Sequence, residues 1–199
     1  KDLGRYGRYL WMAQQLNMKD ELVALSQSLK TALIDWLSYD AEETEHYYAA
    51  YDTWGALIGF NESYGSYQFT DNHFHYGYLT VAAAMMAIVE PEFLEGYGPM
   101  ASLVARQYAN WERDHPMLPR LRTFDIWEGH SWAGGLSSGG GNNQESSSEA
   151  VQSWGGLFLL GAMLGDDDMR DTGAMGWAIE TSAMREYWMD VRNENFPAQ

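Results

Sequence analysis

The 199-residue chain contains no cysteine. A disulfide framework, a thiolate nucleophile and a zinc site that uses cysteine are therefore excluded. Basic side chains are also few, because 12 lysines and arginines stand against 28 acidic residues, for a formal net charge of -16. This charge would repel nucleic acids and anionic membrane surfaces, so we expect neither as a partner. A neutral or cationic partner fits the charge better.

Long apolar runs are missing as well. No stretch approaches the roughly 20 residues needed to span a bilayer. The first ten residues, KDLGRYGRYL, lack the pattern of a signal peptide. A helical pattern begins at once, with no lead-in, so we expect the chain to be a segment of a longer protein.

Aromatic residues, in contrast, are abundant. The chain holds 9 tryptophans, 13 tyrosines and 7 phenylalanines, and its hydrophobic content of 46% rules out a disordered tail. No fixed-period repeat or linker composition divides the sequence. We expect residues 1–199 to form a single domain around an aromatic-rich core.

Apolar residues at spacings of three and four predict several helices. The first places Tyr6, Leu10 and Leu16 on one buried face, and the second takes Asp20 as its N-cap. The fourth places Leu103 inward. The predicted helices span residues 3–16, 18–38, 71–90, 92–113, 144–164 and 168–191.

Two segments break the helical pattern. Residues 46–60 are rich in aromatics and interrupted by two glycines, which predicts a hairpin. Residues 115–143 contain two prolines and the run GLSSGGGNN, which predicts an irregular, mobile loop of a length that is usually functional. A Gly165-Asp166 step predicts a tight turn between the last two helices. The expected fold class is mainly α, with antiparallel helix pairs and a short β-hairpin element.

The first dense polar segment is TDNHFHYGY, at the start of the buried helix predicted over 71–90. One interpretation is an N-cap at Asp71 followed by two structural histidines, His73 and His75. The other is catalytic, because a carboxyl group at the edge of an aromatic pocket is partly desolvated. Desolvation raises its pKa and keeps it protonated as a proton donor. The helix dipole opposes that pKa shift, so both interpretations stay open at this point.

The second polar segment places two glutamates at the start of the helix predicted over 144–164. Glu145 and Glu149 are four residues apart, which on a helix puts both carboxylates on one face. With Asp71 on an opposite wall, they form the arrangement that glycoside hydrolysis requires. Trp127, Trp132 and Tyr76 lie beside these polar residues in the sequence, where sugar rings could stack on their faces.

Other chemistries compete for the same residues. A metal site is chemically reasonable, since imidazole and carboxylate groups suit iron, manganese or zinc, but the Glu-x-x-His signature of di-iron bundles is missing. A nucleophile among the serines of ESSSE lacks the Gly-x-Ser-x-Gly elbow, and the glycine run does not belong to a phosphate-binding motif. The metal ligands would be His73, His75, His130, Glu145 and Glu149.

Three motifs occur in a fixed order: DNHFHYGY, GHSWAGGL and NQESSSEA, preceded by YDTWGALIG and followed by MREYWMD. Together they resemble glycoside hydrolase family 81, the inverting endo-β-1,3-glucanases that cleave laminarin-type glucans, over nearly the whole chain. The resemblance implies part of a catalytic (α/α)6 barrel, a toroid whose twelve helices need more than this chain provides. It also implies a β-1,3-glucan substrate, no metal, no organic cofactor and a secreted enzyme. The oligomeric state stays open.

The resemblance assigns roles residue by residue. Asp71 matches the general acid, Glu145 the general base that activates water, and Glu149 a second required glutamate. In an inverting mechanism the acid and base stand about 6.5 to 9.5 Å apart. The chain departs from the family pattern at Asn72, where histidine is usual, and at Asn142, where lysine is common. Substrate-binding residues are predicted at His75, Tyr76, Asp125, Trp127, His130, Trp132 and Asn143.

Two further functions are weighed against hydrolysis. A β-glucan-binding module could keep the cleft without turnover, but it would not need the like-charge pair Glu145 and Glu149. A polysaccharide lyase would use a tyrosine or histidine base on an acidic polymer, which the net charge of -16 disfavours.

Overall fold

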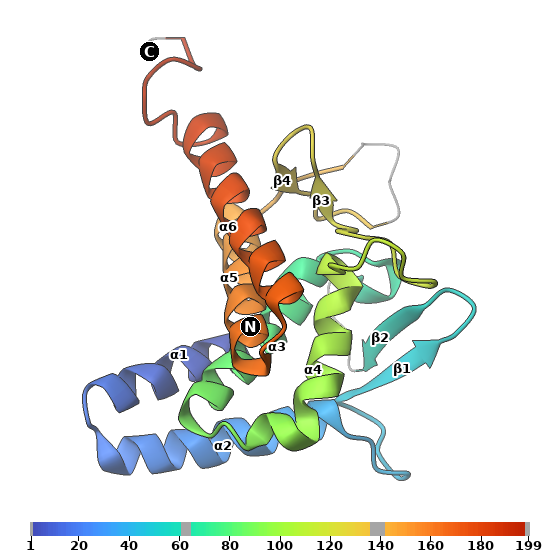
Figure 1. Ribbon diagram of the computed structural model, residues 1–199, viewed down its shortest axis with the longest axis vertical. Helices are drawn as coiled ribbons and strands as arrows, with labels where there is room; N and C mark the ends of the chain where they lie inside the picture. Colours follow the sequence, from blue (N-terminus) through green and yellow to red (C-terminus); the bar gives the residue numbers. More distant parts are fainter. Residues whose placement is uncertain (1, 61–64, 136–141, 198–199) are drawn as a thin grey trace.

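The computed structural model describes residues 2–60, 65–135 and 142–197, and it is mainly helical (Figure 1). The helices are α1 (Asp2–Gln15), α2 (Lys19–Leu37), α3 (Asn72–Val89), α4 (Phe93–Ala109), α5 (Ser147–Leu164) and α6 (Asp167–Tyr187), with a 3-10 turn at Ser66–Gln68. The strands are β1 (Tyr47–Tyr51), β2 (Ala56–Phe60), β3 (Phe124–Asp125) and β4 (His130–Ser131). The prediction of a mainly α fold with a short β-hairpin is confirmed.

Helix α3 is the central element of the fold. It contacts α1, α2, α4 and α5, and nearly all of its side chains are buried, as its continuous apolar sequence predicts. Glycines let α5 approach it closely. A Cβ on Gly77 would lie 2.6 Å from the Cβ of Ser153, and one on Gly156 would lie 2.6 Å from a methyl carbon of Val81. Because α3 is fixed on several sides, its first turn is a rigid platform for the site described below.

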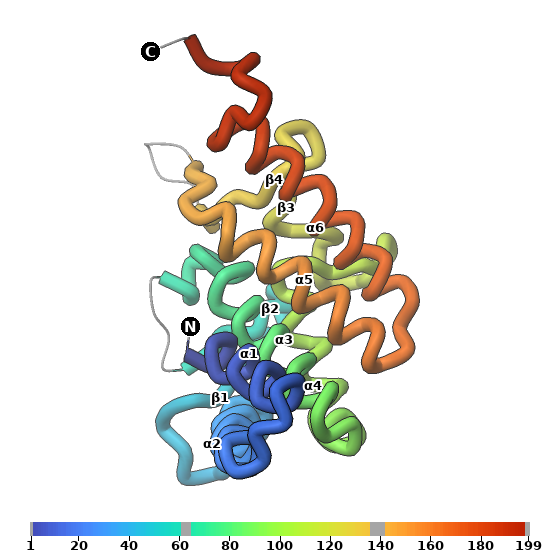
Figure 2. The backbone as a smooth tube through the Cα atoms, turned by 90° about the vertical axis from the view of Figure 1, so that its left-hand side faces the viewer, coloured from blue at the N-terminus to red at the C-terminus, as the bar shows by residue number. Residues whose placement is uncertain are grey.

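Helices α5 and α6 form an antiparallel pair that runs along one side of the molecule (Figure 2). The predicted turn between them is confirmed. Gly165 adopts a left-handed backbone with φ of 70°, and Asp166 caps α6 by accepting a hydrogen bond from the Met169 N–H at 2.9 Å. Helices α1 and α2 form a second pair against α3.

The predicted hairpin is also confirmed. Strands β1 and β2 pair antiparallel, with Tyr47 opposite Phe60 and Tyr51 opposite Ala56. The rings of Tyr47 and Phe60 stack at 4.7 Å between centroids. A second contact, between Trp36 of α2 and Tyr48 at 5.4 Å, attaches the hairpin to the helices. Cross-strand aromatic pairs of this kind stabilise a two-stranded sheet that would otherwise be marginal.

Some predicted helix faces are wrong. Tyr6 of α1 is 42% exposed and Leu16, directly after the helix, is 65% exposed, whereas the buried residues of α1 are Gly4, Gly7, Leu10 and Ala13. The face is rotated because the two glycines bring α1 against α3, where a Cβ on Gly7 would lie 3.2 Å from the Cα of Ala82. Leu103 of α4 is likewise 38% exposed rather than inward.

Several helix ends differ from prediction, among them the end of α4, which lies at Ala109 rather than at the predicted residue 113. Met18, not Asp20, occupies the N-cap position of α2, and Asp20 lies in its first turn. Helix α6 ends at Tyr187, four residues earlier than predicted, and α5 begins at Ser147, three residues later. The last difference changes the geometry of the site.

The predicted glycine-rich loop falls partly outside the described residues, which resume at Asn142. The rest of residues 115–143 is irregular apart from the small β3–β4 sheet, which lies against α6. Within the described part of the chain, every helix is too short or too polar to cross a bilayer.

Candidate active site

Asp71 lies at the start of α3, but its side chain does not cap the helix. Its backbone is left-handed, with φ of 55°, and its carbonyl accepts hydrogen bonds from the N–H groups of Phe74 at 2.9 Å and His75 at 3.0 Å. The Oδ1 atom is buried and has no hydrogen-bond partner among the described residues. Asp71 thus occupies the predicted N-cap position of α3, but without a side-chain cap hydrogen bond. Its carboxyl group is left available for chemistry.

Burial controls the protonation of this carboxyl group. It raises the pKa of Asp71 to about 6, and the negative charges of Glu145 and Glu149 add to the shift. Desolvation, which disfavours the ionised form, is the first cause of this shift. A carboxylic acid that keeps its proton up to about pH 6 is suited to proton donation.

The two glutamates do not share a helical face. Glu145 precedes α5, with a left-handed φ of 64°, while Glu149 lies in the first turn of the helix. Ser146 stands between them in an extended N-cap conformation, with its N–H bonded to the Gln144 carbonyl at 2.9 Å. The predicted helical pair is therefore wrong. Both carboxylates still act on Asp71, because the charge of each raises its pKa.

Each glutamate has its own hydrogen-bond partner. The side-chain amide of Asn143 donates to Oε2 of Glu145 at 3.0 Å, and Glu145 is exposed. The Tyr78 hydroxyl donates to Oε1 of Glu149, which is half-buried. Since Tyr78 lies on α3, this bond ties the start of α5 to the helix that carries Asp71. The predicted substrate-binding residue Asn143 is thus a neighbour of Glu145.

A backbone strap, formed by residues 131–135, joins the turn at Asp71 to the segment that carries the glutamates. The Asp71 N–H donates to the Ala133 carbonyl at 2.9 Å, and the Ala133 N–H donates to the Asn143 carbonyl at 2.8 Å. Beyond Ala133 the strap lies on the chain that leads to Asp71, because a Cβ on Gly135 would be 2.1 Å from the Gln68 carbonyl oxygen. Only glycine permits this approach. The strap brings together segments that are about seventy residues apart in the sequence.

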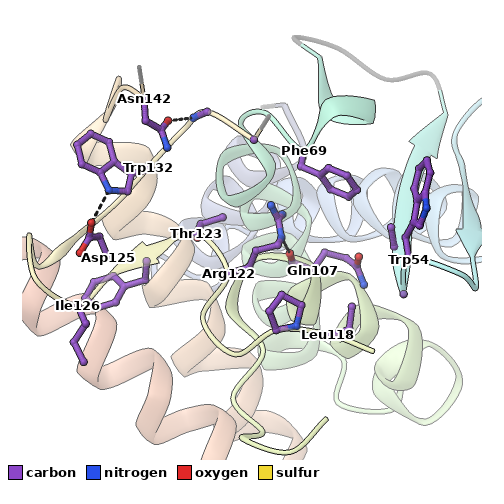
Figure 3. A pocket seen from close by; sticks show the side chains of 16 residues that line it. Trp54, Phe69, Gln107, Leu118, Arg122, Thr123, Asp125, Ile126, Trp132 and Asn142 are labelled. Atoms are coloured by element: carbon purple, nitrogen blue, oxygen red, sulfur yellow. Dashed lines mark hydrogen bonds between the residues drawn. The ribbon is translucent and has the colours of Figure 1, made fainter. Parts of the chain in front are cut away.

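A cleft of about 600 Å³ adjoins this strap (Figure 3). Phe69 and Gly134, which border the Asp71 turn and Ala133, both belong to its walls. Two predicted substrate-binding residues meet there, since the Trp132 indole N–H donates to Oδ2 of Asp125 at 3.0 Å. That bond is the first cause of a lowered pKa of Asp125. The walls consist of Trp54, Gly55, Ala56, Phe69, Gln107, Leu118, Pro119, Arg122, Thr123, Phe124, Asp125, Ile126, Trp132, Gly134, Gly135 and Asn142.

Other predicted substrate-binding residues lie elsewhere. Tyr76 is only 3% exposed, belongs to the main core and donates to the Leu57 carbonyl at 2.8 Å. His130 is 4% exposed and is packed between Trp132 and Trp188. Neither ring offers a face to a sugar, so both predictions are corrected. Trp127 is 92% exposed, on the turn between β3 and β4, and it does not line the cleft.

His75 and His73 differ in their surroundings. His75, one turn into α3, is partly exposed. His73 is fully buried and neither of its ring nitrogens has a hydrogen-bond partner among the described residues. Burial lowers the pKa of His73 to about 3. Among residues 2–60, 65–135 and 142–197, no three histidine, aspartate or glutamate side chains gather into a group able to hold a metal ion.

One residue that lines the cleft, Arg122, is absent from the predicted site residues. Arg122 lines the cleft and donates to Oδ1 of Asn72 at 2.7 Å and to the Gln107 carbonyl at 2.7 Å. Burial lowers the pKa of Arg122 to about 10. No periodic or motif signal marks Arg122, because its segment is irregular.

Glu180 is also absent from the predicted residues, although the sequence carries a signal of its burial. The buried stripe of α6 consists of Met169, Thr172, Gly173, Gly176, Glu180 and Ala183, at spacings of three and four. A carboxylate on such a stripe must be buried and hydrogen-bonded.

Comparison with known proteins gives a consistent result. The model of the glycosyl hydrolase family 81 C-terminal domain matches residues 1–199. A glucan endo-1,3-beta-D-glucosidase of Acetivibrio thermocellus is 38% identical over 98% of this chain and 26% of its own length, and one of Thermobifida fusca is 39% identical over 100% and 27%. A solved structure of a glycoside hydrolase family 81 protein from Clostridium thermocellum is 37% identical, with a TM-score of 0.92, over 98% of this chain and 28% of that one. The chain therefore spans about a quarter of the length of these relatives.

Proposed function

The chain belongs to glycosyl hydrolase family 81, and from this premise we propose that it supplies the catalytic carboxylates of an endo-β-1,3-glucanase. The observation that carries the proposal is the buried carboxyl group of Asp71, with its pKa raised to about 6 under the influence of Glu145 and Glu149. An acid kept protonated beside carboxylates is the pairing that glycoside hydrolysis uses. We also propose that residues 1–199 form a single catalytic domain, which is part of an (α/α)6 barrel.

In the proposed mechanism, Asp71 donates its proton to the glycosidic oxygen as the bond to the anomeric carbon breaks. Glu145 accepts a proton from a water molecule, which attacks the anomeric carbon from the opposite face of the sugar. The configuration of that carbon inverts. Glu145 then releases its proton to solvent and Asp71 takes one up, which restores both groups for the next turnover.

Glu149 has a different proposed role. It is half-buried and bonded to Tyr78, so it is less free than the exposed Glu145 to hold the attacking water. Its charge helps to keep Asp71 protonated. We therefore assign the base to Glu145 and the support of the acid to Glu149.

The proposed substrate is a neutral β-1,3-glucan of the laminarin type. A neutral polymer is not repelled by a protein of net charge -16. The adjoining cleft offers the exposed faces of aromatic residues together with the carboxylate of Asp125, a combination suited to sugar rings and hydroxyl groups. We also propose that the protein is secreted, because its proposed substrate is a polymer.

The test is the anomeric form of the first product released from laminarin, followed by proton NMR. The proposal expects the α-anomer from a β-linked substrate, and loss of all products in Asp71→Asn. Release of the β-anomer would contradict the inverting mechanism. Retention on a glucan affinity gel without any product would instead favour a binding module, and unchanged turnover in Asp71→Asn would remove Asp71 from the mechanism.

A further inference from the structure

Glu180 is a fully buried carboxylate on α6 that the proposed mechanism does not use. It is 0% exposed. Its Oε1 accepts a hydrogen bond from the Ser131 N–H at 2.9 Å, and its Oε2 accepts from the Ser131 hydroxyl at 2.7 Å and from the Trp154 indole N–H at 2.7 Å. Three donors directed at two oxygens match the acceptor pattern of an ionised carboxylate.

These bonds hold one end of the backbone strap. Ser131 is two residues before Ala133, whose carbonyl and N–H bond to Asp71 and Asn143. Between them, the Trp132 N–H donates to the Thr123 carbonyl at 2.8 Å. Segment 131–133 is therefore fixed to the α5–α6 pair at Ser131 and to the catalytic segments at Ala133.

We propose that Glu180 is a positioning residue, which acts through segment 131–133 to set the separation of the acid Asp71 from the base Glu145. This inference rests on the proposed function for its kinetic consequence. Glu180 touches neither Asp71 nor Glu145 in any hydrogen bond of the described residues, so its effect passes through the backbone of the strap.

The chemistry of the site explains why a carboxylate is needed. In Glu180→Gln one acceptor oxygen becomes an NH2 group, which then faces either the Ser131 N–H or both the Ser131 hydroxyl and the Trp154 indole N–H. A buried donor facing a donor loses its hydrogen bond and repels its neighbour, so Ser131 must move. A displacement near 1 Å at reacting groups is enough to cost about 100-fold in rate.

The primary experiment compares Glu180→Gln with the wild type in the full chain. We expect kcat on laminarin to fall about 10- to 100-fold while KM stays within about twofold, because Glu180 does not line the cleft. The second readout is the pKa of the Asp71 carboxyl group, measured by carbon-13 NMR. It should fall from about 6 toward the ordinary aspartate value as the loosened strap admits water.

Two further variants keep the test decisive. Ser131→Ala removes one of the three bonds and leaves the charge of Glu180 in place, so it serves if Glu180→Gln does not fold. Tyr108→Phe is the matched control, since it removes a buried hydrogen bond from Tyr108 to the Ser153 carbonyl at 3.2 Å without touching segment 131–133. We expect Ser131→Ala to shift kcat and the Asp71 pKa in the same direction as Glu180→Gln, and Tyr108→Phe to lower only the melting temperature.

The outcomes separate this inference from the proposed function. If the wild type does not hydrolyse laminarin, the proposed function fails, and the Asp71 titration still decides the role of Glu180. An Asp71 pKa that is unchanged in both Glu180→Gln and Ser131→Ala overturns the inference. So does an equal shift in Tyr108→Phe, since that would show general loosening of the core rather than an effect transmitted through the strap.

Discussion

Asp71 and His73, two residues apart at the start of α3, are both buried, and burial favours the neutral form of each. It raises the pKa of Asp71 to about 6 and lowers the pKa of His73 to about 3, where the nearby charges of Arg122 and His75 add to the shift. Near pH 5, Asp71 is therefore protonated and His73 is unprotonated, so both side chains are neutral. The consequences for stability have opposite signs.

The first prediction concerns stability in acid. Below about pH 6.5 unfolded His73 binds a proton that the folded state does not, so stability falls as pH falls toward 3. Between pH 6 and 3.8 folded Asp71 binds a proton that the unfolded state does not, so stability rises as pH falls. Each slope is about 1.4 kcal/mol per pH unit, and the two offset each other. Urea unfolding of Asp71→Asn from pH 6 to 4 should reveal the uncompensated histidine loss.

The control for this experiment adds His73→Phe to Asp71→Asn. The double variant lacks both titrations, so its free energy of unfolding should lose the steep dependence on pH. Parallel curves for Asp71→Asn and the wild type between pH 6 and 4 would contradict the opposed shifts.

The second prediction contrasts two aspartates at pH 7.5. There the ionised Asp71 destabilises the folded state, and a neutral Asp71→Asn should raise the free energy of unfolding by up to about 3 kcal/mol. Ionised Asp125 instead stabilises the folded state, because the Trp132 indole and two backbone N–H groups hold its pKa below the ordinary value. Asp125→Asn should therefore destabilise the fold at pH 7.5. Chemical denaturation of both variants checks the signs, and a common sign would refute the assigned environments.

The third prediction follows from the same acid. If Asp71 is the proton donor, kcat on a soluble β-1,3-glucan requires its protonated form and should fall above about pH 6, approaching tenfold per pH unit. Initial rates measured from pH 4 to 9 test this, with circular dichroism at each pH to show that the fold is retained. A rate that stays level up to pH 8 would exclude Asp71 as the titrating acid.

The fourth prediction uses two tyrosines on α3. Tyr78→Phe removes the donor to Glu149 and should lower kcat about 10-fold or more, by analogy with other supporting hydrogen bonds of catalytic groups. Tyr76→Phe removes a core hydrogen bond to Leu57 and should cost about 1 kcal/mol of stability with kcat preserved. Steady-state kinetics and thermal melts of both variants separate the two roles. A larger loss of kcat in Tyr76→Phe would restore Tyr76 to the site and refute its correction.

The sequence predicts most of this fold because its signals are local. Apolar patterns locate the six α-helices of the described residues, the hairpin follows from its glycines and aromatics, and the turn at Gly165 follows from its composition. The same locality explains the errors. Glu145 lies outside α5 because Asn143, two residues before it, pairs with Ala133, and a backbone contact between irregular segments leaves no periodic trace. Tyr76 and His130 are adjacent to site residues in sequence but point into the core, which only the packing decides.

In the candidate site, too, residues marked by a local sequence pattern could be predicted and residues placed by irregular backbone could not. A carboxylate placed before an apolar helix predicts either a cap or an acid at Asp71, and in the structure its side chain makes no cap hydrogen bond. Arg122 and the strap could not be predicted, since both depend on irregular backbone. Glu180 was readable in principle, because a glutamate on the small-residue stripe of α6 contradicts the rule that such stripes are apolar.

The fifth prediction tests the close contact of α3 and α5 with two adjacent glycines. A Cβ on Gly156 would lie 2.6 Å from a methyl carbon of Val81 and 3.0 Å from its backbone nitrogen, whereas one on Gly155 would meet nothing nearer than Trp177 at 3.9 Å. Gly156→Ala must push α3 and α5 apart and should cost about 1 to 3 kcal/mol. Gly155→Ala should instead stabilise the helix by about 0.5 to 1 kcal/mol, because alanine loses less backbone entropy than glycine on folding. Since Asp71 lies on α3 and Glu149 on α5, Gly156→Ala should also lower kcat while Gly155→Ala leaves it intact. Equal stabilities for the two variants, measured by urea unfolding, would contradict this helix packing.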